Sequence, residues 1–266
     1  MKTFWTFIVA VVGLAFAAPA QDWAKSRLEK SPRHLEWVTV KNGDREIKCF
    51  IAYPEVKEKA TAVVVIHEIF GLTDWVRGVT DQLAEAGYIA IAPDLLSGTA
   101  KGGGGTAELG GGDAVRKAIS SLPPDQITGD LNAVTAYVKA LPACNGKLAV
   151  GGFCWGGSQS FRFATNNKEV KSAAVFYGTG PESAADLAKI KAPVSGFYGG
   201  NDNRVNATIT KTTEQMKQAG KQYDPVIYDG AGHGFMRAGE QPDANEANKK
   251  ARDEAWKRLK GLLGKI

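Results

Sequence analysis

One stretch near the middle of the chain indicates its fold, Gly151-Gly152-Phe153-Cys154-Trp155-Gly156-Gly157. An apolar run at residues 147–150 precedes it, and helical spacing over residues 158–165 follows it. A strand, a tight glycine turn and a helix are the setting of a nucleophile elbow, where G-x-S-x-G holds its central residue on a sharp turn. Here Cys154 takes the central position, and Gly152 and Gly156 lack side chains where strand and helix nearly touch. The alternative is that Cys154 is a small buried apolar residue at a strand end.

The composition is that of a globular domain rather than of a nucleic-acid-binding protein. The chain has 266 residues, 44% of them hydrophobic, which suits one α/β domain with a full core. Its net charge of +5 is only mildly basic, and the positive residues are scattered. We therefore expect no nucleic-acid partner. No internal repeat or linker divides residues 21–266, so we expect a single domain there.

The first twenty residues have the pattern of a secretory signal peptide. Lys2 is the charged start, residues 4–16 are apolar, and Ala18-Pro19-Ala20 is a small-residue cleavage site. The apolar run is short for a membrane span, although an uncleaved anchor is the alternative. We expect a bacterial periplasmic or secreted protein with no stable membrane insertion after cleavage. Residues 21–33 are polar, and we expect them to form a loosely held arm.

Export makes the three cysteines informative. Cys49 and Cys144 could pair in an oxidising compartment and leave Cys154 as the odd thiol. The alternative is two separate buried thiols, and the spacing alone leaves both open.

Strands and helices alternate after a leading hairpin. Residues 35–40 and 46–53 alternate in polarity around a turn at 42–44, which predicts a hairpin whose turn is one residue longer than the tightest type. Further strands are predicted at 62–66, 88–92, 147–150, 173–177, 194–198 and 226–228, and helices at 74–86, 125–141, 158–165, 207–219 and 244–263. This order predicts a mostly parallel, doubly wound sheet of about eight strands with helices on both faces.

A glycine-rich segment interrupts this order at residues 97–112, with glycines concentrated at 102–112. It has no phosphate-loop lysine, which excludes a nucleotide site. We expect a plain flexible insert, with a mobile loop over the pocket as the alternative.

Polar residues follow the ends of several predicted strands, at the sheet edge where ligands bind in open parallel sheets. They are Glu68, Cys154, Asp202 and His233. The last three occur in the order nucleophile, acid, histidine, which is the α/β-hydrolase order. We expect Cys154 to be the nucleophile and His233 the general base, with Asp202 fixing the tautomer of the histidine.

Two backbone amides are expected to form the oxyanion hole. The amide of Trp155 directly follows the nucleophile, and that of Ile69 follows the strand at 62–66. No metal site is expected, because the three histidines show no ligand spacing and no C-x-x-C is present.

Several separated blocks together resemble the dienelactone hydrolase family. They are His67-Glu68-Ile69-Phe70-Gly71, the Cys154 elbow, Tyr177-Gly178, Asp202 and His233-Gly234-Phe235-Met236-Arg237, and the resemblance runs from about Leu35 to the last residues. It implies the α/β-hydrolase fold and hydrolysis of an enol-lactone without a cofactor.

The same resemblance implies roles for residues around the nucleophile. Glu68 matches the carboxylate that contacts the resting thiol, and Arg237 matches an arginine that binds the substrate carboxylate. Tyr177 and Phe70 are expected substrate contacts. The family's second substrate arginine has no clear match, and Arg116 is the nearest candidate.

His67 stands where the family's type enzyme carries glutamine, and we expect a structural role for it. The sequence thus predicts an exported hydrolase of a small ester or lactone, with a carboxylate-bearing substrate as one option, acting through a thioester on Cys154. The alternative is a thiol redox or small-molecule-binding protein on the same scaffold.

Overall fold

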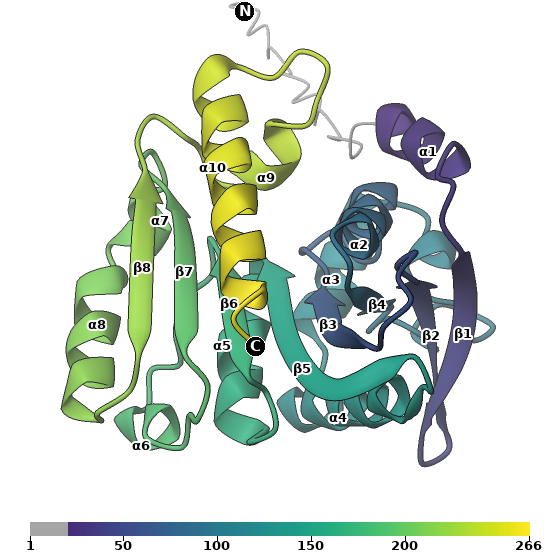
Figure 1. Ribbon diagram of the computed structural model, residues 1–266, viewed down its shortest axis with the longest axis horizontal. Coiled ribbons are helices and arrows are strands. Elements are labelled where there is room, and N and C mark those ends of the chain that lie inside the picture. The colour runs from purple at the N-terminus through teal and green to yellow at the C-terminus, as the bar shows by residue number, and fades with distance from the viewer. Residues whose placement is uncertain (1–20) are drawn as a thin grey trace, which may run out of the picture.

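The computed structural model describes residues 21–266, so the signal-peptide prediction for residues 1–20 lies outside the described part of the chain (Figure 1). Eight strands form one sheet in the order β1-β2-β4-β3-β5-β6-β7-β8. Strand β2 is antiparallel to both of its neighbours, and the other pairs are parallel. The strand bounds are β1 Leu35–Asn42, β2 Arg45–Ala52, β3 Ala60–Ile66, β4 Ile89–Pro93, β5 Cys144–Phe153, β6 Ser172–Phe176, β7 Val194–Gly199 and β8 Tyr223–Tyr228.

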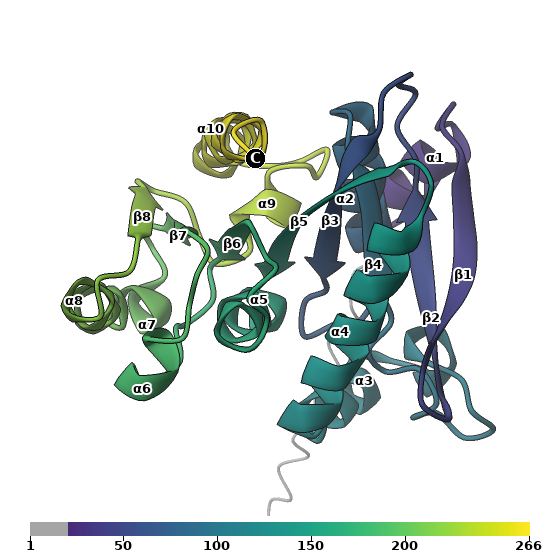
Figure 2. The same ribbon diagram turned by 60° about the horizontal axis from the view of Figure 1, so that its bottom comes forward.

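Helices cover both faces of the sheet, which confirms the predicted α/β-hydrolase architecture (Figure 2). One face carries α1 (Asp22–Glu29), α2 (Asp74–Glu85) and α10 (Glu246–Leu263), and the other carries α4 (Pro124–Ala140), α5 (Trp155–Asn166) and α8 (Ile209–Gln218). Shorter helical segments are η1 Thr106–Leu109, α3 Gly112–Ser120, α6 Ala184–Leu187, α7 Asn203–Asn206 and α9 Phe235–Ala238.

The two covered faces explain the continuous apolar runs in the central strands. Every residue of β3 and of β4 is buried, because side chains that alternate along a strand meet helices on both sides. The core accordingly divides into two large apolar clusters, one on each face of the sheet.

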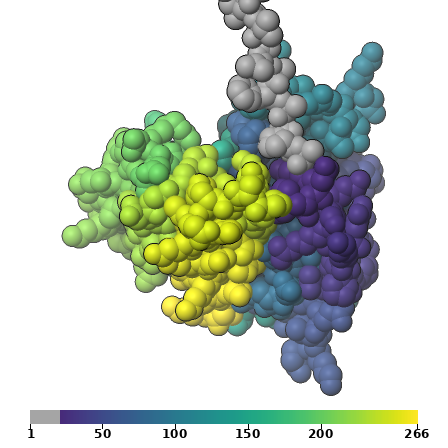
Figure 3. Space-filling model, turned by 90° about the horizontal axis from the view of Figure 1, so that it is seen from above, coloured from purple at the N-terminus to yellow at the C-terminus, as the bar shows by residue number. Residues whose placement is uncertain are grey.

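The N-terminal arm is not loosely held, and that prediction is wrong. Residues 22–29 form α1, which buries Ala24 and Leu28 against the face that α2 and α10 cover. Arg33 then binds Asp81 of α2 through two hydrogen bonds of 2.6 and 2.8 Å. The polar composition of the arm concealed these contacts, because two apolar residues four positions apart are enough to dock a short helix. Figure 3 shows this N-terminal segment in purple beside the C-terminal segment in yellow.

The arm also completes a neighbouring helix. The side-chain carbonyl of Gln21 accepts a hydrogen bond of 2.8 Å from the backbone N–H of Trp75, in the first turn of α2. The first N–H groups of a helix lack intrahelical partners, so this contact satisfies one of them.

The hairpin turn is shorter than predicted. Asn42 pairs directly with Arg45, which leaves Gly43 and Asp44 as a two-residue turn. Gly43 has φ 59°, the left-handed conformation that such tight turns need at their first central position. The prediction failed because Asn42 was assigned to the turn rather than to the strand.

The glycine-rich segment is anchored rather than a plain insert. Thr106 donates hydrogen bonds from its N–H and its hydroxyl to the two carboxylate oxygens of Asp94, at 2.8 and 2.7 Å. Helix α3, which was not predicted, follows, and its Val115 and Ile119 pack near Ile69. The segment therefore abuts the loop after β3.

Cys49 and Cys144 are both buried and unpaired in the structure, in agreement with the alternative of two separate thiols. Among residues 21–266, no helix is both long and apolar enough to cross a membrane.

Candidate active site

The carboxyl ends of the parallel strands bring together the residues that the sequence singled out. Glu68 follows β3, Cys154 follows β5, Asp202 follows β7 and His233 follows β8. Parallel strands all end at the same edge of the sheet, so residues up to 165 positions apart in the chain become neighbours there.

Cys154 sits on a strained turn between β5 and α5. Its φ of 56° and ψ of −117° lie in a region that residues with side chains seldom occupy, at a cost of about 1–3 kcal/mol. Its N–H donates to the carbonyl of Phe176 at 3.0 Å, and its carbonyl accepts from the N–H of Ser158. The turn therefore holds the thiol at the sheet edge, directly before the N-terminus of α5.

Two glycines make this turn sterically feasible. A Cβ on Gly152 would lie well under 3.0 Å from the carbonyl oxygen of Gly156. A Cβ on Gly156 would in turn lie well under 3.0 Å from the carbonyl oxygens of Ile66 and His67. Because all of these neighbours are backbone atoms, no side-chain rotation could relieve the clash, and the elbow requires glycine at both positions.

His233 connects the thiol to an acid. Its Nδ1 lies 2.5 Å from Oδ2 of Asp202, which is buried and also accepts a hydrogen bond from the N–H of Val205. A hydrogen bond with Cys154, together with the Asp202 carboxylate, outweighs burial and raises the pKa of His233 to about 9. The imidazole therefore carries its second proton at neutral pH, with the sulfur of Cys154 on one side and the carboxylate of Asp202 on the other.

Tyr177 packs against this histidine. Its ring meets that of His233 edge to face with the centroids 5.1 Å apart, and its φ of 41° shows a second strained position at the end of a strand. The hydroxyl of Tyr177 is buried without a hydrogen-bond partner among residues 21–266. Burial raises the pKa of Tyr177 well above its usual range, so the hydroxyl keeps its proton.

Glu68 and Arg237 form an ion pair at the same edge of the sheet. Nε of Arg237 donates to Oε2 of Glu68 at 2.9 Å, and the carboxylate is only 1% exposed. Burial raises the pKa of Glu68, and the positive charge of Arg237 opposes this increase. Arg237 also lies over the ring of Phe70, 5.4 Å from its centroid. Within the described residues, Glu68 thus contacts the arginine and makes no hydrogen bond to the Cys154 thiol.

A cleft of about 350 Å³ opens at the thiol. Of the predicted site residues, its walls include Cys154, Trp155, Ile69 and Tyr177, whereas Arg237 and Phe70 do not line it. The five other lining residues were not among the predicted site residues: Ser158, Gly178, Thr179, Arg204 and Val205. Arg204 comes two positions after Asp202, and this proximity in sequence was the available signal.

Two residues that the sequence left open are now placed. Nδ1 of His67 bonds the carbonyl of Glu68 at 2.9 Å, and its Nε2 accepts from the N–H of Leu95 at 3.3 Å. Burial lowers the pKa of His67, so this imidazole is a neutral structural link, as expected. Arg116 pairs with Asp113 on α3 and does not line the cleft.

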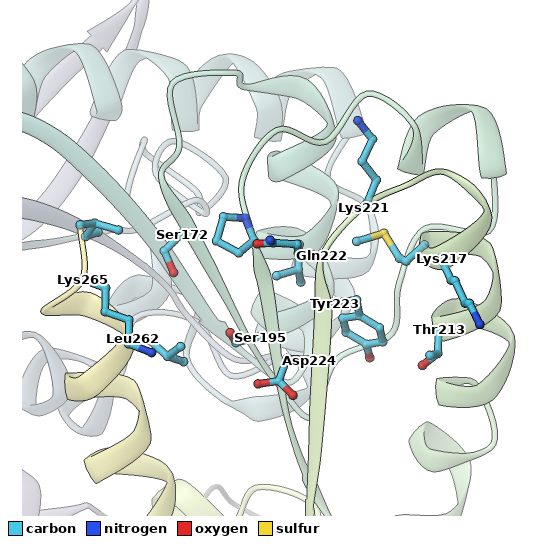
Figure 4. Close-up of a pocket in the computed structure, with 14 residues that line it drawn as sticks. Ser172, Ser195, Thr213, Lys217, Lys221, Gln222, Tyr223, Asp224, Leu262 and Lys265 are labelled. Atoms are coloured by element: carbon cyan, nitrogen blue, oxygen red, sulfur yellow. The ribbon is translucent and has the colours of Figure 1, made fainter.

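A more voluminous cavity, of about 780 Å³, lies at the opposite end of the sheet (Figure 4). It is formed around the starts of β6, β7 and β8, with Ser172, Pro193 and Gln222 among its walls. No cysteine or histidine lines it, so it has no counterpart of the Cys154–His233 pair. Residues 21–266 also contain no cluster of three or more histidine, cysteine, aspartate or glutamate side chains that could hold a metal ion.

Comparison with known proteins gives a consistent result. The sequence model of the dienelactone hydrolase family matches residues 47–266. A Methylorubrum extorquens protein provisionally named carboxymethylenebutenolidase is 33% identical over 227 residues, which are 81% of this chain and 76% of the relative. A Yersinia pestis protein of the same provisional name is 31% identical over 215 residues, covering 76% of this chain and 79% of the relative.

A crystal structure from Klebsiella pneumoniae, described provisionally as a dienelactone hydrolase, superposes with a TM-score of 0.76 at 24% identity. It covers 88% of this chain and 99% of the other. At this identity the superposition supports the fold.

Proposed function

This chain belongs to the dienelactone hydrolase family, and we propose that it cleaves a small ester or lactone through a thioester on Cys154. One observation carries the proposal. A cysteine on a strained elbow contacts an imidazole that a buried carboxylate holds at 2.5 Å. Nucleophile, base and orienting group in this geometry are the requirements of covalent acyl transfer.

Acylation begins with the thiol proton on His233. The sulfur attacks the carbonyl carbon of the substrate and forms a carbon–sulfur bond, and the carbonyl oxygen becomes an oxyanion. The amides of Trp155 and Ile69 would donate to this oxyanion, and the N-terminus of α5 favours negative charge at the same place. When the carbon–oxygen bond breaks, the leaving alkoxide takes the proton from the imidazolium.

Deacylation uses the same groups with water as the nucleophile. The neutral His233 removes a proton from water, and the hydroxide attacks the thioester carbon. The carbon–sulfur bond breaks, so that the acid is released and the sulfur and the imidazolium return to their starting state. Asp202 keeps Nδ1 of the ring occupied throughout, so that Nε2 faces the reacting atoms.

Glu68 would act on the Cys154 thiol and the His233 imidazole through its charge. The buried carboxylate and His233 attract each other, which favours the imidazolium form. The positive charge of Arg237, whose Nε lies 2.9 Å from Oε2 of Glu68, opposes the rise that burial causes in the pKa of Glu68. We therefore assign the Glu68–Arg237 pair to the electrostatics of the thiol and imidazole, and substrate contact by Arg237 would require a guanidinium nitrogen that Glu68 does not use.

The experiment compares three proteins on two kinds of substrate. The chain from residue 21 is assayed with dienelactone and with short nitrophenyl esters, beside Cys154→Ala and His233→Ala. We expect each variant to lose about 10³-fold or more of the rate. A wild-type rate no higher than that of the two variants would falsify the hydrolase proposal.

The same assay tests the alternative of a thiol redox or binding protein. A redox thiol needs neither an acid nor a histidine in this order, so the presence of both Asp202 and His233 favours hydrolysis. If the wild type shows no hydrolysis but Cys154 oxidises reversibly with peroxide, the redox function replaces the hydrolase.

We also propose that the protein is exported to the periplasm or secreted. The support is the charged, apolar and small-residue pattern of residues 1–20. Mass spectrometry of the protein from fractionated cells should find an N-terminus at Gln21 outside the cytoplasm. A full-length cytoplasmic product would contradict the proposal.

A further inference from the structure

Two hydrogen bonds fix the buried ring of His67 at the start of the loop that follows β3. In a neutral imidazole one nitrogen is a donor and the other an acceptor. The backbone N–H of Leu95 donates to Nε2 of His67 at 3.3 Å, so Nε2 is the acceptor. Nδ1 therefore carries the proton, and it donates to the backbone carbonyl of Glu68 at 2.9 Å.

The carbonyl of Glu68 sets the direction of the next backbone N–H. It also accepts from the N–H of Gly71 at 3.1 Å, so two donors hold the same oxygen. The peptide between Glu68 and Ile69 is trans, and in a planar trans peptide the C=O and the N–H point in opposite directions. The N–H of Ile69 thus points away from the two donors. No backbone carbonyl among residues 21–266 accepts from it, and Ile69 lines the thiol cleft.

The same histidine contacts the segment that carries the second expected oxyanion donor, the amide of Trp155. The ring of His67 stacks on the indole of Trp155, with the centroids 5.5 Å apart and the planes inclined by 16°. The backbone carbonyl of His67 lies so close to Gly156 that a Cβ there would be well under 3.0 Å away. His67 therefore packs against both segments that have to supply N–H groups to an oxyanion.

We propose that His67 is a positioning residue of the oxyanion hole, which holds the N–H of Ile69 towards the cleft and the indole of Trp155 in place. It acts through these groups and does not touch the substrate. This inference rests on the proposed function, because an oxyanion forms only when Cys154 attacks a carbonyl group. The two hydrogen bonds of His67 reach neither Cys154 nor His233, so the thiol should keep its reactivity without them.

The kinetic test compares a reaction that forms an oxyanion with one that does not. His67→Leu removes both hydrogen bonds, and for hydrolysis of a short nitrophenyl ester kcat should fall about 10²-fold with little change in KM. His67→Asn offers an amide N–H near the place of Nδ1 and should regain part of this loss. Alkylation of Cys154 by iodoacetamide displaces iodide from a saturated carbon, so its rate should stay within about twofold of the wild type.

Val64→Ala is the matched control, because it removes buried side-chain volume from β3 without changing the loop at His67. Urea unfolding measures the stability of each variant, and the control should keep the wild-type kcat. If His67→Leu does not fold, His67→Asn is compared with the wild type instead, and kcat should fall further than the rate of alkylation. The inference is overturned if the variant slows hydrolysis and alkylation equally, or if Val64→Ala lowers kcat as much.

A binding measurement separates this inference from the hydrolase proposal. With a trifluoromethyl ketone, the thiol proton passes to His233, the sulfur adds to the carbonyl carbon, the oxygen becomes an oxyanion, and no group leaves. Fluorine NMR measures the affinity of this adduct, which should be about 10²-fold weaker in His67→Leu. Equal affinity, or a wild type that forms no adduct, refutes the inference whatever the hydrolysis assay shows. An adduct that depends on His67 in a protein that hydrolyses no ester refutes the hydrolase alone.

Discussion

The replacement Arg237→Leu would leave the Glu68 carboxylate buried without its positive partner. Glu68 is 1% exposed, and the 2.9 Å bond from Nε of Arg237 is its one side-chain hydrogen bond among residues 21–266. Removing one partner of a buried ion pair costs about 3–5 kcal/mol if the charge remains. The carboxyl group can lower this cost by taking up a proton.

The free energy needed to keep Glu68 protonated in the folded variant depends on pH. A glutamate in an unfolded chain has a pKa of about 4.3. Keeping its carboxyl group protonated costs about 1.36 kcal/mol for each pH unit above that value. Folding with a neutral Glu68 therefore costs about 3.7 kcal/mol at pH 7 and about 1 kcal/mol at pH 5. The variant should thus regain about 2.7 kcal/mol of its lost stability between pH 7 and pH 5. The sign follows from a folded pKa above the unfolded one, which makes stability fall as the pH rises.

Urea unfolding of Arg237→Leu at pH 5, 6 and 7 measures this difference. The double variant Glu68→Gln, Arg237→Leu is the control, because it has no carboxyl group to titrate while the rest of the site is unchanged. A pH dependence that is equal in the single and double variants would show that the buried charge is not its source. A loss that stays constant from pH 7 to pH 5 would contradict the protonation argument.

The elbow, the imidazole and the N-terminal arm can be tested separately. Gly156→Ala should cost about 1–3 kcal/mol in urea unfolding and abolish activity, because the added methyl group meets backbone carbonyls; a fully active variant would refute the close approach. The rate of hydrolysis should fall above about pH 9, where His233 loses the proton that the leaving alkoxide needs, and Asp202→Asn should move this decline to lower pH. A decline that stays in place in the variant would exclude Asp202 as a cause. Arg33→Leu leaves Asp81 buried and should cost about 3–5 kcal/mol, with faster tryptic cleavage of the arm; unchanged proteolysis would show that the ion pair does not hold it.

The sequence predicted the elements whose signal is local. The apolar run at 62–66 and the glycines around Cys154 are patterns that can be recognised within a few neighbouring residues, and the structure has β3 and the elbow at these positions. The order of Cys154, Asp202 and His233 then placed the site, because strand ends of a parallel sheet converge without further information.

Contacts between distant segments were not predictable in the same way. The docking of α1 depends on Asp81, 48 positions after Arg33, and nothing near either residue indicates the other. The pairing of Glu68 with Arg237 spans 169 positions, and it removed Arg237 from the cleft for which the resemblance had suggested it. Arg204 was missed because its one signal, a position two residues after Asp202, does not by itself distinguish it from other exposed arginines.

If residues 1–20 are removed as proposed, the hydrogen bond from Trp75 to Gln21 ties the accuracy of that cleavage to folding. Gln21 is the residue expected to begin the mature protein, and its side chain completes the first turn of α2. A peptidase that cut one residue too late would therefore release a chain without Gln21. The backbone N–H of Trp75, in the first turn of α2, would then lack its hydrogen-bond partner. Misprocessed molecules would be less stable than correctly processed ones, and the proteases of the compartment would remove them first. The side chain of Gln21 would thus make the stability of the folded protein depend on cleavage at the correct position.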